Sequence, residues 1–412
     1  MGEEPNRTTP RRRRLVLGVR SLLVAVLLVG GLLGWVLHRA RVRREVVAVV
    51  LKAGGHVEYD WQQDQPGRAS PKNGPEVPEW CLKLFGPNFF QEVRGVAIGN
   101  LRPDEATDEI LHEIGRLDGV EELNIHGSGI TDAGFASLAK LTRLRRLIFS
   151  SGGVTGASLA SLEGMNQLRE LDLSVSLKDE DLTNLSGMKS LEVLQFRGKT
   201  GLGDVALSHL KGLTNLTSLI IDDGQVTDAG LAHLTGMKKL IILSLGNHPI
   251  TDKGLVHLRG LSALANLALY GTRITSLEPI RNLTGLKLLS IGGTGITDEG
   301  LAPIAGFARM YYLNAARTGL TDAALLHLKS LEELQRLALN ETKIGDAGVA
   351  SLVGLPRLED LYLSGTEVTD AGLKCLHQLR GLRQIDLSDT KATDAGIATL
   401  KVALPDASIE GP

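Results

Sequence analysis

The chain has 412 residues, and 43% of them are hydrophobic, which is enough for the cores of two or three globular domains. The formal net charge is −2, but the first 52 residues hold 11 Lys or Arg and three Glu, whereas the rest hold 34 Lys or Arg and 44 Asp or Glu. A mildly acidic bulk gives no support for nucleic-acid binding, so we expect no nucleic-acid partner.

The first predicted element is an apolar helix close to the N-terminus. Residues 1–14 form a basic tail that ends in four arginines, and residues 15–37 form an apolar stretch that only Arg20 interrupts. The uninterrupted part, residues 21–37, is near the lower limit of about 17 residues for crossing a bilayer. Arg20 is close enough to one end to reach the headgroups, and Trp35 suits the other interface. We therefore predict a transmembrane helix over residues 15–37.

The flanks of this helix bear on its processing and orientation. It ends in the basic segment 38–41, a poor cleavage site, so the sequence favours an uncleaved anchor over a signal peptide. Six arginines lie at its N-terminal side and four follow its other end. This balance predicts a single-pass protein with its N-terminus in the cytoplasm and the bulk of the chain outside, in the periplasm or cell envelope.

Residues 38–79 connect the anchor to the rest of the chain. Residues 42–52 are apolar with flanking charges, which predicts a helix that stops at the glycine pair that follows. Residues 56–61 alternate weakly between polar and apolar and predict a short strand. Residues 62–78 are rich in Gln, Pro and Gly, which is typical of a linker.

The densest group of aromatic side chains lies within residues 80–95 and consists of Trp80, Phe85, Phe89 and Phe90. This segment precedes a long series of sequence repeats, whose first unit would expose its apolar end without a cap. We predict that residues 80–95 are this N-terminal cap and that a divergent first strand follows at Val96 and Ile98.

From Leu123 to Leu387 an L-x-L-like pair recurs at a nearly constant interval. The 12 pairs are Leu123/Ile125, Leu147/Phe149, Leu171/Leu173, Leu194/Phe196, Leu219/Ile221, Leu243/Leu245, Leu267/Leu269, Leu289/Ile291, Leu313/Ala315, Leu337/Leu339, Leu361/Leu363 and Ile385/Leu387. Eight of the 11 steps between them have the same length as the step from Leu337 to Leu361. A globular core needs no such period, whereas a solenoid does, because each unit must stack on the next.

The unit at residues 358–381 shows the pattern of one repeat. Leu361 and Leu363 belong to a short strand and are predicted to point inward. The Thr-Asp-Ala-Gly motif at residues 369–372 then opens a helix, because Thr and Asp accept hydrogen bonds from the free amides of a helix start. Related Thr-Asp-x-Gly motifs stand at residues 131–134, 227–230, 297–300 and 393–396.

These repeats resemble the leucine-rich repeat family, and most closely the subclass seen in F-box leucine-rich proteins and in many bacterial envelope proteins. The resemblance covers roughly residues 96–409. The family's usual Asn or Cys after the strand is replaced by Thr272, Thr294, Thr318, Thr342, Thr366 and Thr390. The resemblance implies an α/β fold over residues 80–412, a right-handed solenoid or horseshoe with an inner parallel sheet, outer helices and a C-terminal cap at residues 402–412.

Packing distances agree with this arrangement. Strands stack about 4.8 Å apart, whereas helices need about 8–10 Å, so the strands must line the inner curve. Cys81 and Cys375 then lie at opposite ends of the solenoid, and we expect no disulfide between them.

One unit departs from the period. The step from Leu267 to Leu289 is two positions shorter than the usual one, and Thr-Ser-Leu-Glu-Pro at residues 275–279 replaces the helix-opening motif. This unit resembles the shorter internalin-type repeat, so we expect its outer helix to be shortened.

The inner curve of the arc carries a candidate protein-binding surface. Residues beside the buried pairs face this curve, and near its centre they are apolar or aromatic: Ile220, Ile242, Tyr270, Leu288, Tyr312 and Tyr362. Acidic side chains flank them at Glu170, Asp172, Asp222, Asp360 and Asp386. Exposed aromatics in a hollow surface are typical of binding anchors, so we expect a protein ligand on this concave face. The alternative is that these positions show only the strand preference of such side chains.

Two recurring sets of polar residues are better explained by the repeat than by chemistry. His209, His233 and His257 lie one repeat apart on the outer face, too widely separated to share a zinc ion. The aspartate column consists of Asp132, Asp228, Asp252, Asp298, Asp322, Asp346, Asp370 and Asp394. We interpret this column as helix capping, because acid–base work needs one pair singled out by its environment. We predict no catalytic residue, metal ion, cofactor or small-molecule substrate.

These features predict a membrane-anchored leucine-rich repeat protein that mediates protein–protein interaction and is not an enzyme. Its N-terminal layout is similar to that of leucine-rich repeat proteins from planctomycete-type bacteria, in which an Arg-rich start and one span precede a Gly-Gly-x-Val-x-Tyr-Asp stretch, here residues 54–60. Two alternatives stay open. The likeness to F-box repeats suggests a ubiquitin-ligase substrate adaptor, although only the short segment 38–79 separates the span from the cap. A structural envelope spacer or adhesin is the other.

Overall fold

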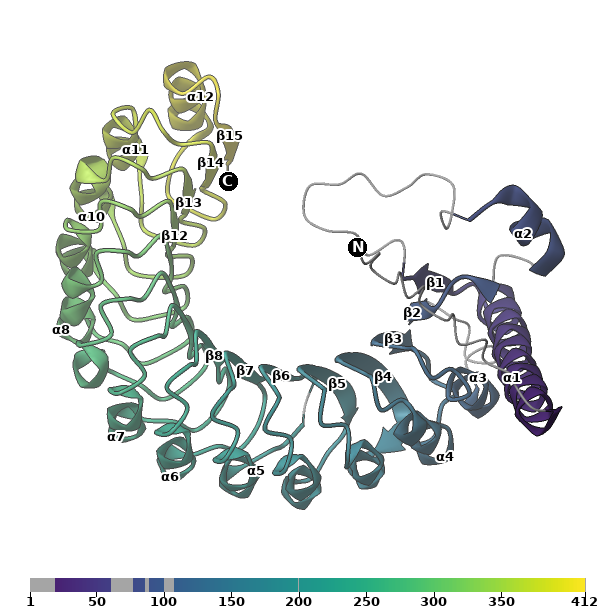
Figure 1. The fold of residues 1–412 in the computed structure, drawn as a ribbon. Coiled ribbons are helices and arrows are strands. Elements are labelled where there is room, and N and C mark those ends of the chain that lie inside the picture. The colour runs from purple at the N-terminus through teal and green to yellow at the C-terminus, as the bar shows by residue number, and fades with distance from the viewer. Residues whose placement is uncertain (1–18, 61–76, 86–88, 100–106, 199, 412) are drawn as a thin grey trace, which may run out of the picture.

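The computed structural model describes residues 19–60, 77–85, 89–99, 107–198 and 200–411. The predicted basic tail, the first residues of the predicted span (15–18) and most of the predicted linker lie outside the described residues. The described chain forms a horseshoe in which strands line the inner curve and helices line the outer curve (Figure 1). The predicted α/β solenoid with an inner, mostly parallel sheet is therefore confirmed.

The described strands form a single sheet in which they follow one another in chain order. Strand β1 is antiparallel to β2, and each later pair of neighbours is parallel. The strands are β1 (His56–Tyr59), β2 (Val93–Ile98), β3 (Glu122–His126), β4 (Arg146–Thr155), β5 (Glu170–Ser176), β6 (Val193–Phe196), β7 (Ser218–Ile221), β8 (Ile242–Ser244), β9 (Asn266–Ala268), β10 (Leu288–Ser290), β11 (Tyr312–Asn314), β12 (Arg336–Ala338), β13 (Asp360–Tyr362), β14 (Gln384–Asp386) and β15 (Ser408–Glu410).

Short helices cover the outer curve. The α-helices are α1 (Val19–Lys52), α2 (Glu79–Phe85), α3 (Asp108–Ile114), α4 (Asp132–Phe135), α5 (Asp204–Leu210), α6 (Asp228–Leu231), α7 (Asp252–Leu255), α8 (Asp298–Leu301), α9 (Asp322–Leu325), α10 (Asp346–Ser351), α11 (Asp370–Leu376) and α12 (Asp394–Ala403). The 3₁₀ helices are η2 (Ala136–Lys140), η3 (Gly156–Leu162), η4 (Asp179–Leu185), η5 (Ala232–Leu234), η6 (Val256–Leu258), η7 (Glu278–Ile280), η8 (Ala302–Gly306), η9 (Leu326–Leu328) and η10 (Leu352–Gly354).

The repeated leucines set the register of the parallel sheet. Leu289 pairs with Leu267 on one side and with Leu313 on the other, and all three side chains are fully buried. The same stacking continues along the arc and gives one core between the sheet and the outer helices. Full burial of a leucine side chain contributes roughly 1.5–3 kcal/mol, so each repeat is stabilised mainly by its contacts with its two neighbours.

Threonines cap α4, α6, α7, α8, α9, α11 and α12, as predicted, whereas α5 and α10 begin after a glycine. The Thr227 hydroxyl accepts a hydrogen bond from the amide of Ala229 at 3.3 Å. A second threonine follows each strand from β9 to β14, and it is buried in all of them except β14, where Thr390 is partly exposed. The Thr366 hydroxyl, for example, donates to the carbonyl oxygen of Leu363 at 2.6 Å, and it thereby satisfies a buried carbonyl in the place where the family usually has Asn or Cys.

The carboxylates of the aspartate column bind donors at the start of the next repeat's helix and not of their own, and they thereby connect successive repeats. Asp228 in α6 accepts hydrogen bonds from the amide of Thr251 at 2.7 Å and from its hydroxyl at 2.6 Å, in the next repeat. Asp370 makes the same two bonds with Thr393, at 2.8 Å each. One carboxylate thus satisfies two donors at the start of the following helix through charge-assisted bonds. We call this arrangement the aspartate bridge.

The glycine of the Thr-Asp-x-Gly motif makes room for this bridge. A Cβ added at Gly254 would lie 2.5 Å from Asp228 Oδ1, which is closer than real atoms approach. Ala324 is an exception, since Asp298 still accepts from the Thr321 amide at 2.9 Å. The carboxylate can therefore shift to accommodate a methyl group in at least one repeat.

Helix α1 is continuous, whereas the sequence predicted a separate helix at residues 42–52. Its C-terminal part packs on the first strands, where Val46 and Val50 are fully buried. The helix is followed by Gly54, whose φ of +73° favours glycine, and the chain then enters β1. Helix α1 and β1 therefore close this end of the core.

The aromatic segment predicted as the cap contributes less to this end of the core. Trp80 in α2 is 66% exposed, whereas Val93, at the start of β2, is buried. Val46 and Val50 close the core instead, because their spacing of four residues places them on one face of α1. The predicted first strand at Val96 and Ile98 is present as β2.

The short repeat and the C-terminal end match their predicted structures. Between β9 and β10 the structure has only η7, so the outer helix is shortened as expected. At the C-terminal end, β15 pairs with β14, and Leu404 and Ile409 are buried against the last repeat. Cys81 and Cys375 are both free.

Candidate functional site

Strand geometry places one column of side chains on the inner face. Leu219 and Ile221 in β7 are fully buried, whereas Ile220 between them is partly exposed, because successive side chains of a strand point to opposite faces. All six predicted apolar anchors are partly exposed on or next to strands of the central arc: Ile220, Ile242, Tyr270, Leu288, Tyr312 and Tyr362.

The anchors form separate groups rather than one band. Leu288 and Tyr312 are direct neighbours in register on β10 and β11. Ile242 on β8 is separated from Leu288 by Asn266 on β9. Leu288 and Tyr312 therefore form one apolar pair at the start of their strands, whereas Tyr270 stands apart from them in the turn after β9.

Tyr362 lies beyond a charged pair and is already engaged. Its hydroxyl donates a hydrogen bond to Gln384 Oε1 at 2.9 Å. Between it and Tyr312 on β11, Arg336 Nε on β12 donates to the Asp360 carboxylate on β13 at 2.6 Å. Hydrogen bonding to Asp360 raises the pKa of Arg336. Asp360 is thus neutralised within the sheet and does not present a free negative charge.

The acidic residues nearer the N-terminus are also paired. The Asp172 side chain, 5% exposed, accepts hydrogen bonds from Arg197 Nε at 2.9 Å and from Nη2 at 2.7 Å. This bidentate contact raises the pKa of Arg197. Glu170 lies 3.0 Å from Arg146 on the neighbouring strand. Glu170, Asp172 and Asp360 of the predicted acidic rim therefore form internal ion pairs, which a basic partner would have to break. Asp386 accepts a hydrogen bond from the Ser388 amide at 3.0 Å.

Tyr270 lies across the neighbouring repeat. A Cβ at Gly246 would overlap its ring, so the ring occupies the space that this glycine leaves open. Its phenol donates to the carboxylate of Asp222, two repeats earlier. Burial and the charge of Asp222 raise the pKa of Tyr270 to about 12. Asp222 also accepts from Ser244 Oγ at 2.8 Å and from the Gly246 amide at 2.7 Å, which fixes its position.

A hollow of about 660 Å³ opens on the other side of Tyr270. Its residues are Asn247, Tyr270, Gly271, Ser290, Gly292, Gly293, Asn314, Ala316, Arg317, Asn340 and Glu341. Four of them are Gly or Ala, so backbone is accessible between β9 and β11. Asn340 Oδ1 is buried here and has no hydrogen-bond partner among the described residues. We call this the central hollow.

Sequence reasoning found Tyr270 but missed the central hollow. The available signal was the run of small residues at Gly292, Gly293 and Ala316, in the turns that follow two adjacent strands. The only charged residues that line the hollow are Arg317 and Glu341, which form an ion pair at 2.9 Å. The hollow therefore offers an aromatic wall, amide groups and a neutral floor.

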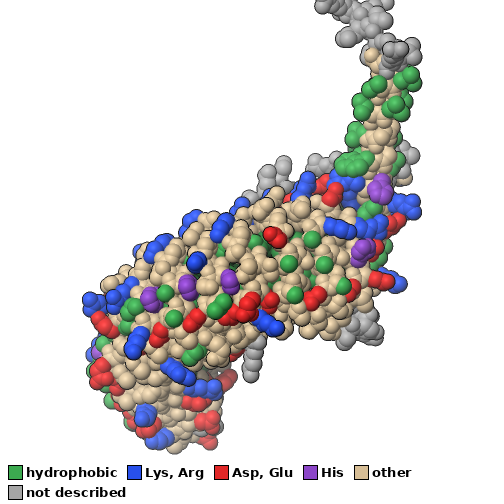
Figure 2. Space-filling model, turned by 90° about the horizontal axis from the view of Figure 1, so that it is seen from below, with side chains coloured by type: hydrophobic (Ala, Val, Ile, Leu, Met, Phe, Trp, Pro, Cys, Tyr) green, Lys and Arg blue, Asp and Glu red, His purple; other side chains and the backbone are tan. Residues whose placement is uncertain are grey.

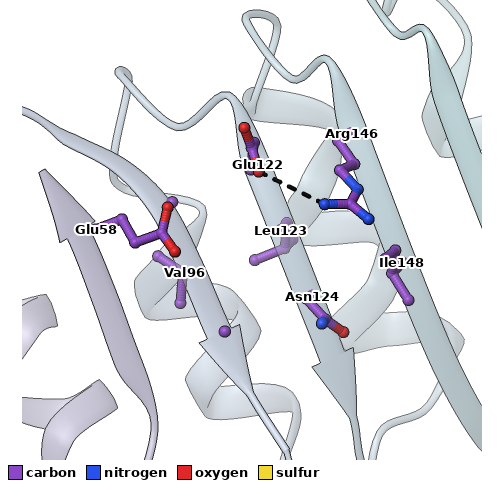
Figure 3. Close-up of a pocket in the computed structure, with 9 residues that line it drawn as sticks. Glu58, Val96, Glu122, Leu123, Asn124, Arg146 and Ile148 are labelled. Carbon is purple, nitrogen blue, oxygen red and sulfur yellow. Dashed lines mark ion pairs between the residues drawn. The ribbon is translucent and has the colours of Figure 1, made fainter. Parts of the chain in front are cut away.

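A smaller hollow of about 100 Å³ lies on the inner face near β1 (Figure 3). Glu58, Asn124 and Arg146 line it from three different strands. Arg146 lies 3.9 Å from Glu122 and is therefore shared between this carboxylate and that of Glu170. This end of the inner face is charged and shallow, so the central hollow is the better candidate site.

The histidine column lies on separate outer helices. His209 is in α5, His233 in η5 and His257 in η6, and the ring of His209 contacts the Thr183 hydroxyl at 3.1 Å. Across the described part of the chain, no three His, Cys, Asp or Glu side chains are grouped so that they could hold a metal ion.

Comparisons with known proteins agree with this architecture. Residues 332–391 and residues 283–305 match two family models, both described as leucine-rich repeats. These two segments thus match the leucine-rich repeat family, which the fold of the described chain also resembles. No curated protein matches its sequence.

Two solved structures share the fold. The crystal structure of an internalin from Listeria monocytogenes has 24% sequence identity and a TM-score of 0.55, over 72% of this chain and 86% of that one. The structure of a leucine-rich repeat protein from Leptospira interrogans has 17% identity and a TM-score of 0.55, over 81% of this chain and 92% of that one. At these identities the likeness concerns the fold alone.

Proposed function

We propose that this chain is a membrane-anchored scaffold that binds another protein in the central hollow and carries out no catalysis. Leucine-rich repeat proteins generally mediate protein–protein interactions, and one apolar helix long enough to cross a membrane precedes the repeats. The central hollow, with Tyr270 beside it and an unpartnered Asn340 oxygen within it, is the observation that carries the proposal.

The exposure of α1 supports the anchor. Leu27 is 74% exposed and Leu28 is 68% exposed, in a stretch where nearly every large apolar side chain is open to the surroundings. Such a surface is unfavourable in water and favourable in hydrocarbon. The same helix continues into the core at Val46, so the anchor is joined rigidly to the repeats and not through a linker.

Contacts of α1 with the repeats support the proposed orientation. Arg39 forms an ion pair with Asp118 and stacks on Trp35, with 4.5 Å from its guanidinium carbon to the ring centroid. Arg43 donates a hydrogen bond to the carbonyl oxygen of Gln91. Two of the four arginines after the span are therefore engaged by residues outside α1, and a third, Arg41, pairs with Glu45 at 2.9 Å. The six on its N-terminal side then favour a cytoplasmic N-terminus and repeats in the periplasm or cell envelope.

Photo-crosslinking in intact cells tests the binding site. A photoreactive residue at Ser290, which lines the central hollow, should give a defined protein adduct that mass spectrometry identifies. Tyr270→Ala removes the aromatic wall of the hollow and should lower the yield about 30-fold, because an aromatic anchor commonly contributes roughly 2 kcal/mol or more. Tyr311→Ala is the matched control, since Tyr311 is 36% exposed and lies in the loop before β11, outside the residues that line the hollow.

The outcomes separate the proposed scaffold from its alternatives. Equal yields for both tyrosine variants, or no adduct at all, would remove the central hollow as the site and favour a structural spacer. Protease treatment of intact cells tests the orientation. Full protection of the repeats would place them in the cytoplasm.

A further inference from the structure

Helix α1 leaves the arc at the edge where the strands begin. After α1 the chain reverses at Gly54 and runs back along the helix as β1, which is antiparallel to β2. Helix α1 therefore runs in the direction of the parallel strands. Consistently, Arg39 contacts Asp118 in the loop before β3, whereas Val49, near the end of α1, lies beside Asp108 at the start of α3. The apolar part of α1 thus extends beyond the loops that join each outer helix to the next strand.

These loops are strongly basic. Between residues 141 and 383, eleven of them hold 15 Lys or Arg and only five Asp or Glu. We call them the basic edge. The opposite edge, where strands pass into outer helices, carries the aspartate bridges. Figure 2 shows that Lys and Arg side chains gather along the edge from which α1 projects, whereas Asp and Glu gather along the other edge.

Much of this positive charge has no counter-charge within the protein. Lys211, Lys238, Lys239, Lys287, Arg309 and Lys329 are exposed, and none of them has a carboxylate within 4.0 Å among the described residues. Lys238 and Lys239 bond only to neutral acceptors, the Gly260 carbonyl oxygen at 3.1 Å and Asn215 Oδ1 at 2.7 Å. The inner face differs, since its arginines are paired with carboxylates. These positive charges repel one another unless a negatively charged partner outside the protein neutralises them.

We propose that the basic edge lies on the anionic phospholipid headgroups of the leaflet that faces the repeats. This inference rests on the proposed membrane anchor. The helix projects from this edge, so insertion brings the edge, and not the acidic one, towards the bilayer. Each basic side chain close to an anionic surface strengthens binding about five-fold. Figure 2 shows the arc sloping away from the free end of α1, and the ordinary helix tilt of about 20° in a bilayer allows it to settle on the surface.

This orientation determines how a partner reaches the central hollow. The strands cross the arc from the basic edge to the acidic edge, so they stand upright on the membrane. The inner face then opens sideways, parallel to the bilayer. A partner would approach along the membrane surface and not from above it.

Two matched label sites in the same part of the arc test the contact. Gly306 is at the basic edge and Gly319 at the acidic edge, and a Cβ at either position meets no atom within 4 Å. The full chain, with Cys81 and Cys375 replaced by Ser, is labelled at Gly306→Cys or Gly319→Cys with a fluorophore. It is then placed in nanodiscs that contain headgroup-quencher lipids, with or without phosphatidylglycerol. We expect quenching at position 306 only, and only with the anionic lipid.

Charge variants provide the control. Lys238→Gln, Lys239→Gln and Lys287→Gln together should weaken the contact by up to about 100-fold, at roughly five-fold per charge. Lys253→Gln, Arg273→Gln and Lys343→Gln remove the same charge from exposed sites on the acidic edge and should leave quenching unchanged. Equal quenching at both label sites, or equal loss in both variants, would overturn the proposal. Extraction of the unlabelled chain by alkaline carbonate would instead refute the anchor, and this inference with it.

Discussion

Asp228→Ala tests how the repeats are joined. The substitution removes the acceptor for the Thr251 amide at 2.7 Å and for its hydroxyl at 2.6 Å. Hydrogen bonds to a charged group contribute about 1.5–3 kcal/mol, and the loss leaves a partly buried donor without a partner, so the free energy of unfolding should fall by roughly 2–3 kcal/mol. Because each repeat contacts only its neighbours, the loss should be concentrated at the interface between α6 and α7.

Asp394→Ala is the matched control for this experiment. Asp394 stands at the same position of the motif, in α12, which is the last outer helix of the described residues. Its removal costs only the favourable interaction of a negative charge with a helix start, about 0.3–1 kcal/mol. The difference between the two variants therefore measures the aspartate bridge itself.

Urea unfolding of the detergent-solubilised full chain, followed by circular dichroism, gives the two free energies. Hydrogen exchange at the Thr251 amide reports the same bridge locally and should accelerate only in Asp228→Ala. If the two variants lose equal stability and the Thr251 amide exchanges at the wild-type rate, the aspartate bridge does not join the repeats and our reasoning is wrong.

Three further predictions concern single side chains. Gly246→Ala should displace the ring of Tyr270 from Asp222, and the pKa of this tyrosine, about 12 in the native chain, should fall towards 10 in an ultraviolet titration. Burial lowers the pKa of His248 below 6.5, so on acidification the imidazole is protonated in the unfolded chain before it is protonated in the folded chain. The free energy of unfolding should therefore decline as the pH drops below about 6.5, and His248→Gln should lack this decline. The hydrogen bond from the Thr393 amide lowers the pKa of Asp370. The ionised carboxylate should therefore stabilise the fold above pH 3.8, and this stabilisation should be lost as the pH falls through the lower pKa of the folded state. Acid unfolding of Asp370→Asn should lack this pH-dependent loss of stability.

The strands and their register could be predicted because one physical constraint repeats. Leu289 must stack on Leu313 and Leu267 if each unit is to bury its core, and the nearly constant period leaves little other choice. Threonine caps follow from the chemistry of a helix start alone. Both predictions depend on local sequence and on one neighbour, which the period identifies.

The role of α1 as the N-terminal cap was harder to predict from the sequence. No helix breaker separates residue 37 from residue 42, and Val42, Val46 and Val50 lie at intervals of four residues, which indicates one buried face. An apolar helix in lipid and an apolar helix face against protein have similar composition. The change of surroundings along α1 is therefore marked in the sequence only by this spacing of valines, and the aromatic segment after α1 was the more obvious cap.

The candidate site was predictable in position but not in its contacts. Arg336 and Asp360 occupy the same place in adjacent repeats, so their pairing follows from the register and could have been foreseen. Tyr270 is different, because it reaches Asp222 two repeats away only by lying across Gly246. Its contact depends on a rotamer, which the repeat period does not determine. The central hollow is the space that this rotamer leaves open.

The short repeat shows that satisfying the helix start, and not the aspartate itself, is what each interface requires. Ser276 provides no carboxylate for the following repeat. There the Thr297 amide donates to the carbonyl oxygen of Thr275 at 3.3 Å, and the Leu277 amide donates to the carbonyl oxygen of Gly300 at 2.8 Å. A Cβ at Gly300 would overlap the Thr275 carbonyl oxygen, so the backbones approach closely enough to bond directly. The two-residue shortening and the missing aspartate are therefore one adaptation, because the shorter unit brings a backbone acceptor to the place where other repeats use a carboxylate.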